Sequence, residues 1–224
     1  MKKNAFTLAE VLLVIGIIGI VASVTLPNLS KNTSDADTVA KVKKTVATLQ
    51  TALDMAKDKY GEDISTWTAS DSSDADKAAR YGTRLSEFLS VSKTCGLNTN
   101  QGCFSSSNVT QITGTASTNP IDQNSDYYKI ILNDGASIGF GSSFIYFDVD
   151  GSNKGLNKRG RDIFYVSYSD NNIYWYIPSS FNNANGINYC RSGMASYCTG
   201  WIMNFGNMDY VNCSGLTRTN TTCH

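Results

Sequence analysis

The sequence predicts an α+β protein, in which a long N-terminal helix packs on a head that contains an antiparallel sheet and a disulfide-rich C-terminal region. Three observations support this class. An uncharged apolar run covers residues 11–26, a stripe of apolar residues at helical spacing continues to residue 60, and residues 127–177 alternate short β-rich runs with turn sequences. Helical patterns followed by strand patterns are typical of α+β folds.

The composition argues against two function classes. The chain has 224 residues with 19 basic and 19 acidic side chains, and a protein without net positive charge or a basic stripe is a poor nucleic-acid binder. The single histidine is the last residue, His224, so a Ser-His-Asp or Cys-His centre would have to form at the chain end. We therefore expect no enzymatic activity and no nucleic-acid partner.

The first 26 residues combine a basic start with a long apolar segment. Lys2 and Lys3 precede 21 residues from Phe6 to Leu26, in which Glu10 is the one charged side chain. As a helix this segment spans roughly 31 Å, the thickness of a bilayer core. A cleaved secretory signal and a plain single-span anchor both fit the basic start. Neither explains Glu10, because a carboxylate at membrane depth costs several kcal/mol unless it is paired or neutralised.

The order of the first ten residues offers a third explanation. Met-Lys-Lys-Asn-Ala, followed by Phe6-Thr7-Leu8-Ala9-Glu10 and an apolar helix, resembles the class III signal of type IV pilins and type II secretion pseudopilins. The resemblance implies that a prepilin peptidase cuts between Ala5 and Phe6, N-methylates Phe6 and leaves Glu10 as the fifth mature residue. The new α-amine of a neighbouring copy can then pair with Glu10 when helices pack side by side. Pro27 lies where family members often have a helix-kinking proline, whereas Ala5 replaces the usual glycine and is expected to make processing slower or more selective.

The resemblance also implies the organisation and function of the chain. Residues 1–5 would be the leader peptide, residues 6–27 the transmembrane and filament-core helix, residues 28–61 its amphipathic continuation, and residues 62–224 the exported globular head. The chain would be a structural subunit, a pilin or pseudopilin, of a type IV pilus-like or type II secretion filament. It would first lie in the bacterial inner membrane with its N-terminus in the cytoplasm, and later in an extracellular filament or at the cell surface. Implied partners are the prepilin peptidase, an assembly ATPase, an inner-membrane platform, and copies or relatives of the chain.

The segment after Pro27 predicts an amphipathic helix that ends near Gly61, a C-cap signal. Seven residues recur at spacings of three and four and share one helical face. They are Val39, Val42, Val46, Leu49, Leu53, Ala56 and Tyr60. A second, shorter helix is expected within residues 71–90, where an acidic start suits the helix dipole.

The sequence predicts a loop and then strands over residues 94–177. Residues 94–126 have the composition of a loop. Alternating patterns and turn sequences then predict five strands, of which the first two and the last two form hairpins. Their expected ranges are 127–132, 137–140, 144–149, 163–168 and 173–177.

The six cysteines all follow the apolar run, and no two of them form a C-x-x-C motif. An even number in an exported chain favours disulfides. Fifteen pairings are open, and sequence proximity favours Cys95 with Cys103, Cys190 with Cys198, and Cys213 with Cys223. Loops of this size contribute roughly 2 to 3 kcal/mol each in the chain-entropy model.

Residues 148–162 are the densest polar segment. Oxygen ligands at alternate positions before Gly151 resemble the opening of a calcium loop, although Asn153 and Arg159 do not fit the sixth and twelfth places of an EF-hand. The segment also resembles a loop of the sheet region in pilin-like proteins, some of which bind calcium. The candidate ligands for a Ca²⁺ that would rigidify the head are Asp148, Asp150, Asn153, Asn157 and Asp162. The competing interpretation is an Asp-Gly hairpin turn whose acids are balanced by Lys154, Lys158, Arg159 and Arg161.

A function from another class stays open, namely a membrane-anchored surface adhesin or glycan-binding module that does not polymerise. Its sugar-binding face would be aromatic and would consist of Trp175, Tyr165, Tyr168, Tyr174 and Tyr176. Aromatic residues in strands are more commonly cross-strand pairs that fill a sheet. An exported enzyme is a distant third.

Overall fold

The computed structural model describes residues 8–169 and 171–223, apart from the side chains of residues 8–11, 19–33, 116–118, 169 and 178. Helices and antiparallel strands are both present, so the expected α+β class is confirmed. The chain forms two compact units, Met1–Asp37 and Thr38–His224. We refer to the second as the head unit.

Helix α1 runs from Leu8 to Tyr60, and its helical assignment continues through position 27. The helix ends where the sequence predicts, because Gly61 adopts a φ of +107° and donates its N–H to the carbonyl of Lys57 at 2.9 Å. Within residues 8–169 and 171–223, none of the helices has both the length and the apolar composition needed to cross a membrane. The span expected over residues 6–27 is therefore unconfirmed.

The apolar stripe of the second half of α1 faces the core of the head unit, as expected. Five of its seven residues are buried, and the first and last are partly buried against the same core. The buried members are Val42, Val46, Leu49, Leu53 and Ala56. Burial of a Val or Leu side chain is worth about 1.5 to 3 kcal/mol, so this stripe holds the helix to the head.

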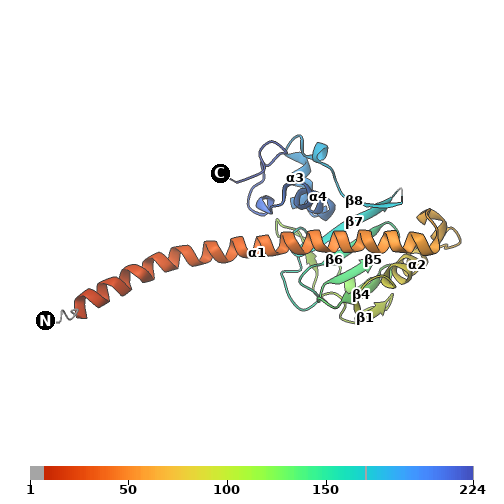
Figure 1. Cartoon of the computed structure of the whole chain (residues 1–224), viewed down its shortest axis with the longest axis horizontal. Helices are drawn as coiled ribbons and strands as arrows, with labels where there is room; N and C mark the ends of the chain where they lie inside the picture. Colours follow the sequence, from red (N-terminus) through yellow and green to blue (C-terminus); the bar gives the residue numbers. More distant parts are fainter. Residues whose placement is uncertain (1–7, 170, 224) are drawn as a thin grey trace. The chain divides into compact units, whose positions relative to one another are not determined.

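A six-stranded antiparallel sheet forms the centre of the head unit (Figure 1). Its strands lie in the order β1-β4-β5-β6-β7-β8, so neighbours after β4 are also consecutive in the chain. They are β1 (Val91–Gly96), β4 (Tyr128–Leu132), β5 (Ser137–Phe140), β6 (Phe144–Asp148), β7 (Ile163–Ser169) and β8 (Asn172–Tyr174). The five strands expected after residue 126 are all present, although β8 is shorter than predicted.

The segment expected to be a loop also contains strands. Strand β1 pairs with β4 through an irregular register, and β2 (Val109–Thr110) pairs with β3 (Ala116–Thr118) in a separate two-stranded sheet. These strands are short or bulged, so their sequences lack a sustained alternation. Pairing with distant partners, rather than local pattern, makes them strands.

The two faces of the sheet belong to different cores. One face contributes Ile138, Phe147 and Phe164 to the large core that includes the α1 stripe. The other face contributes Ile163 to a smaller core with Phe104 and both cysteines of the first disulfide. Side chains of a strand alternate between faces, which explains how Ile163 and Phe164 reach different cores.

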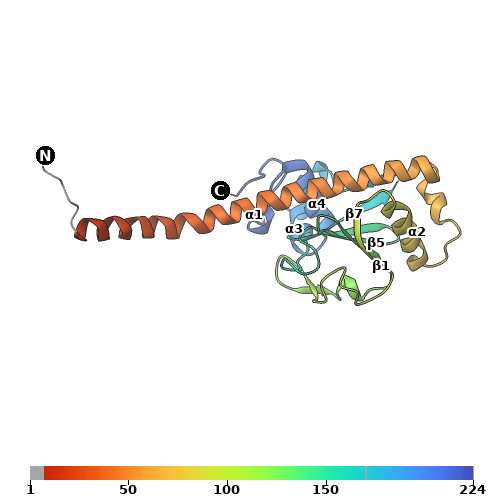
Figure 2. The same cartoon turned by 60° about the horizontal axis from the view of Figure 1, so that its bottom comes forward.

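Helix α2 (Asp74–Ser86) packs against β4 and β5, and its N-cap Ser73 accepts the N–H of Asp76 at 3.0 Å. Beyond β8 the chain forms two helices that the sequence analysis does not predict, α3 (Asn185–Arg191) and α4 (Ala195–Phe205). Helix α4 contacts β7 (Figure 2). Trp201 of this helix is fully buried. Short 3₁₀ helices complete the fold: η1 (Ile64–Thr68), η2 (Ile121–Gln123), η3 (Pro178–Phe181) and η4 (Asp209–Val211).

Candidate functional site

The residues expected to act in processing and assembly lie at the N-terminal end. Ala5 and Phe6 are outside the described residues, and for Glu10 and Pro27 the structure describes the helix but not the side chain. Six large apolar residues of α1 are each 54–65% exposed. They are Leu12, Leu13, Val14, Ile15, Ile17 and Ile18. Because successive helical residues point in different directions, these side chains surround the helix, and an exposed apolar surface of this kind marks a contact with lipid or protein.

Asp148, at the end of β6, closes the first turn of the polar loop. Its Oδ1 accepts the N–H groups of Asp150 at 3.0 Å and Gly151 at 3.1 Å. Its buried Oδ2 has no hydrogen-bond partner among the described residues. Burial, and then the nearby negative charge of Asp162, raises the pKa of Asp148 to about 8.

Asp162 closes the second half of the loop. Its carboxylate accepts the N–H groups of Leu156, Asn157 and Lys158, the last two at 2.6 Å. The backbone approaches this carboxylate closely at Gly155, which adopts a φ of +82°. A Cβ at this position would lie 2.4 Å from Oδ2 of Asp162, so only glycine fits there. Burial raises the pKa of Asp162, while the donated N–H groups oppose that rise.

The loop is also tied to neighbouring segments. The amide of Asn157 donates to the carbonyls of Ser107 and Asn108. Lys41 of α1 donates to Asp150 at 3.0 Å, and Lys44 pairs with Asp134 in the β4–β5 turn at 2.7 Å. The helix and the two turns are therefore joined by charge as well as by the core.

The five calcium candidates make different contacts, and Asp148 lies close enough to Asp162 for the two charges to interact. Asp150 is paired with a lysine, Asn157 donates to backbone carbonyls, and Asp162 is occupied by backbone N–H groups, while Asn153 is exposed. In the part of the chain that the structure describes, no group of three His, Cys, Asp or Glu side chains could hold a metal ion. The arrangement instead matches the competing interpretation in part, since the acidic side chains stabilise turns.

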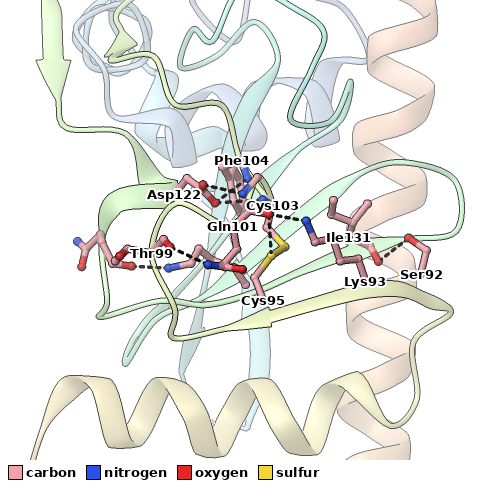
Figure 3. Close-up of a disulfide and its surroundings, with 12 residues drawn as sticks. Ser92, Lys93, Cys95, Thr99, Gln101, Cys103, Phe104, Asp122 and Ile131 are labelled. Atoms are coloured by element: carbon pink, nitrogen blue, oxygen red, sulfur yellow. Dashed lines mark hydrogen bonds between the residues drawn. A yellow bond between two sulfur atoms is a disulfide. The ribbon is translucent and has the colours of Figure 1, made fainter.

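The three disulfides join the pairs that sequence proximity favours: Cys95–Cys103, Cys190–Cys198 and Cys213–Cys223. The first links β1 to the following loop, beside the buried carboxylate of Asp122 (Figure 3). Asp122 accepts the N–H groups of Gly102 at 2.8 Å, Cys103 at 3.0 Å and Phe104 at 3.2 Å. No sequence pattern indicates the role of Asp122, because an aspartate two residues after Asn-Pro is typical of an ordinary turn.

The five aromatic residues of the expected sugar-binding face do not share one face. Tyr168 lies in the large core, 4.5 Å from the ring of Tyr81, and Trp175 is partly buried against the same core. Tyr174 and Tyr176 are exposed. Alternation along the strands separates these residues, so the expected sugar-binding face is wrong as proposed.

Comparison with known proteins identifies similarity over part of the chain. Over 56 residues it is 48% identical to the type II secretion system core protein G of Escherichia coli (strain K12). It has the same identity, over the same length, with the type II secretion system core protein G of Aeromonas hydrophila. The similarity is confined to a quarter of the chain.

This alignment covers 25% of the chain and 38% of each of the two relatives. No family model matches the sequence. No solved structure matches it either. The similarity therefore supports a relationship with a secretion-system core protein over one segment, while the head unit is described by its own geometry.

Proposed function

We propose that the chain is a structural subunit, a pilin or pseudopilin, of a type II secretion or type IV pilus-like filament, without enzymatic activity. The observation that carries this proposal is the 56-residue similarity to type II secretion system core protein G. The order of residues 1–10, with Phe6 and Glu10 at the start of an apolar segment, also supports it.

In this proposal the prepilin peptidase cuts between Ala5 and Phe6 and methylates the new amine. Glu10 of one copy then pairs with the α-amine of a neighbouring copy. Pairing removes the cost of a lone carboxylate in an apolar surrounding. Pro27 belongs to the same assembly segment.

The exposed apolar side chains of Leu12–Ile18 support such an assembly segment. Each large apolar side chain gains about 1.5 to 3 kcal/mol when it is fully buried. Lipid would cover these side chains before assembly, and helices of neighbouring subunits would cover them afterwards. The inner membrane is therefore the proposed first location, with an assembly ATPase and its membrane platform as partners.

The three disulfides support export of the head, since disulfides persist in oxidising compartments and are rare in the cytosol. The final location proposed for the head is the exposed surface of the filament. Its ion pairs and backbone-binding carboxylates would keep the head rigid within that filament.

The test combines processing and assembly in cells that produce the secretion or pilus machinery. Mass spectrometry of the mature N-terminus should find methylated Phe6, whereas Ser23 would indicate a secretory signal and Met1 a plain anchor. Glu10→Ala should abolish incorporation into sheared filaments without loss of membrane insertion. Glu62→Ala is the matched control, because Glu62 is an exposed carboxylate of the head unit. Normal filament yield from Glu10→Ala would overturn the assembly mechanism.

A further inference from the structure

A groove of about 610 Å³ opens on the head unit away from α1. Tyr146 of β6 lines it, and Tyr146 alternates with Ile145 and Phe147, which belong to the core shared with α1. Tyr146 therefore points to the opposite face of the sheet. The segment 119–125 forms one wall, and Tyr127 and Arg159 line the groove beside Tyr146. The volume is within the range of small-ligand sites, about 300 to 1,000 Å³.

Aromatic rings supply the apolar surface of this groove. The rings of Tyr127 and Tyr146 meet edge to face at 5.3 Å, and Tyr146 is followed by Tyr165 at 5.2 Å. Phe144 continues the row at 5.7 Å from Tyr165 and is 43% exposed. Tyr165 and Phe144 lie outside the groove lining. Tyrosine offers a flat apolar face together with a hydroxyl group, so Tyr127 and Tyr146 can contact a ring-shaped ligand that is also polar.

The remaining lining is polar and carries one positive charge. Asn119, Gln123, Asn124 and Ser125 supply amide and hydroxyl groups, and no carboxylate is among the described residues that line the groove. The guanidinium of Arg159 lies 5.9 Å from the ring centre of Tyr146 and donates to the carbonyl of Gly193 at 3.2 Å.

The positive charge of Arg159 interacts with the hydroxyl groups of Tyr127 and Tyr146. Burial raises the pKa of Tyr127 and that of Tyr146, and the positive charge of Arg159 opposes the rise at each residue. A guanidinium matches the geometry of a carboxylate, with which it can form two parallel hydrogen bonds. The groove thus combines an anion-binding group with aromatic faces and neutral hydrogen-bonding groups.

We propose that this groove binds a six-membered sugar ring that carries a carboxylate, with the ring on Tyr127 and Tyr146 and the carboxylate toward Arg159. Other ligand classes fit less well. A nucleic acid would need several cations, and Arg159 is the one cation among the described lining residues. A lipid chain would need an aliphatic lining, and Ile121 is the one aliphatic residue there. The proposal holds whether or not the chain polymerises.

Titration of the full chain in detergent with glucuronate, N-acetylneuraminate and glucose tests the proposal. Calorimetry and saturation-transfer NMR should detect binding of at least one of the two acids. Glucose should bind at least about tenfold more weakly, because it lacks the carboxylate. Equal binding of glucose, or no binding of either acid up to about 10 mM, would overturn the proposal.

Variants locate the binding site. Arg159→Gln should weaken binding of the acid at least about tenfold, and Arg159→Lys should restore part of the loss. Lys154→Gln is the matched control, since Lys154 is an exposed cation of the same loop that does not line the groove. If Arg159→Gln unfolds the head, Gln123→Ala tests whether the acid binds in this groove, because Gln123 is an exposed groove residue outside the cores. Unchanged affinity in Gln123→Ala, or equal losses in Arg159→Gln and Lys154→Gln, would contradict this site.

Discussion

The two compact units differ in the exposure of the apolar side chains of α1. In the head unit, Val42, Leu49 and Leu53 of α1 are no more than 1% exposed. In the first unit, described residues of the same helix such as Leu13 and Ile15 are more than 60% exposed. Residue type does not cause this difference, because both segments carry aliphatic side chains. The core of the head unit buries its own part of α1, whereas the apolar side chains of Leu12–Ile18 are exposed.

The difference suggests that the two units have different roles. A buried stripe on one face of a helix stabilises the fold to which it belongs. Apolar side chains all around a helix instead favour lipid or neighbouring helices. Substitutions in the first unit should therefore affect assembly, and substitutions in the head should affect stability.

The largest expected effect comes from placing a charge in each segment of α1. Leu13→Asp should leave the thermal unfolding of the head unchanged within about 0.5 kcal/mol and reduce filament incorporation at least about tenfold. Leu49→Asp should unfold the head, since even truncation of a buried leucine costs about 2 to 5 kcal/mol. Circular dichroism and filament shearing measure the two effects. If Leu13→Asp also unfolds the head, the division between the units is wrong.

The next largest effect concerns the disulfides of the head. Cys190 and Cys198 are both fully buried and join α3 to α4, whereas Cys223 is exposed. Replacing both Cys190 and Cys198 by alanine should cost about 2 to 5 kcal/mol of unfolding free energy. The same double substitution at Cys213 and Cys223 should cost less, because less packing is lost. Denaturant titration compares them, and the reverse order would show that loop closure alone decides the contribution.

A smaller effect depends on pH and on Asp148. The folded carboxyl has a pKa of about 8, and an unfolded aspartate has a pKa of about 3.9. Between these values the folded head binds more protons than the unfolded chain, so its stability falls as pH rises, by at most about 1.4 kcal/mol per pH unit. Urea unfolding at about pH 5 and about pH 8 measures the slope.

Asp148→Asn should remove most of this slope. A remainder is expected, because burial also raises the pKa of Asp162 and acts in the same direction. Stability that rises with pH in the unmodified head would contradict the buried, protonatable state of Asp148.

The smallest effect is expected for the lysines that tie α1 to the turns. Lys44 and Asp134 are both exposed, whereas Lys41 and Asp150 are partly buried. Exposed ion pairs contribute about 0 to 1 kcal/mol, so Lys44→Ala should lower the unfolding free energy by less than about 1 kcal/mol. A loss comparable to that of Leu49→Ala would mean that these pairs, rather than the apolar stripe, hold the helix.

Part of the site could be predicted from the sequence and part could not. The polar loop was recognisable as a site of turns, because Asp148 and Gly151 are typical turn residues. The contacts of its carboxylates were not predictable, since a carboxylate can bind a metal or backbone N–H groups, and the N–H groups of Asn157 and Lys158 reach Asp162 only in the folded loop. Asp122 was missed for the same reason.

The α+β class, the stripe of α1 and the five strands follow from the sequence alone, which also favours the observed disulfide pairs, because each depends on local periodicity or short loops. Folding was needed to define β1, α3, α4, the separation of the aromatic residues and the groove at Tyr146 and Arg159. These features depend on contacts between residues far apart in the chain. Local propensities cannot specify such contacts, because their free energy appears only when the partners meet.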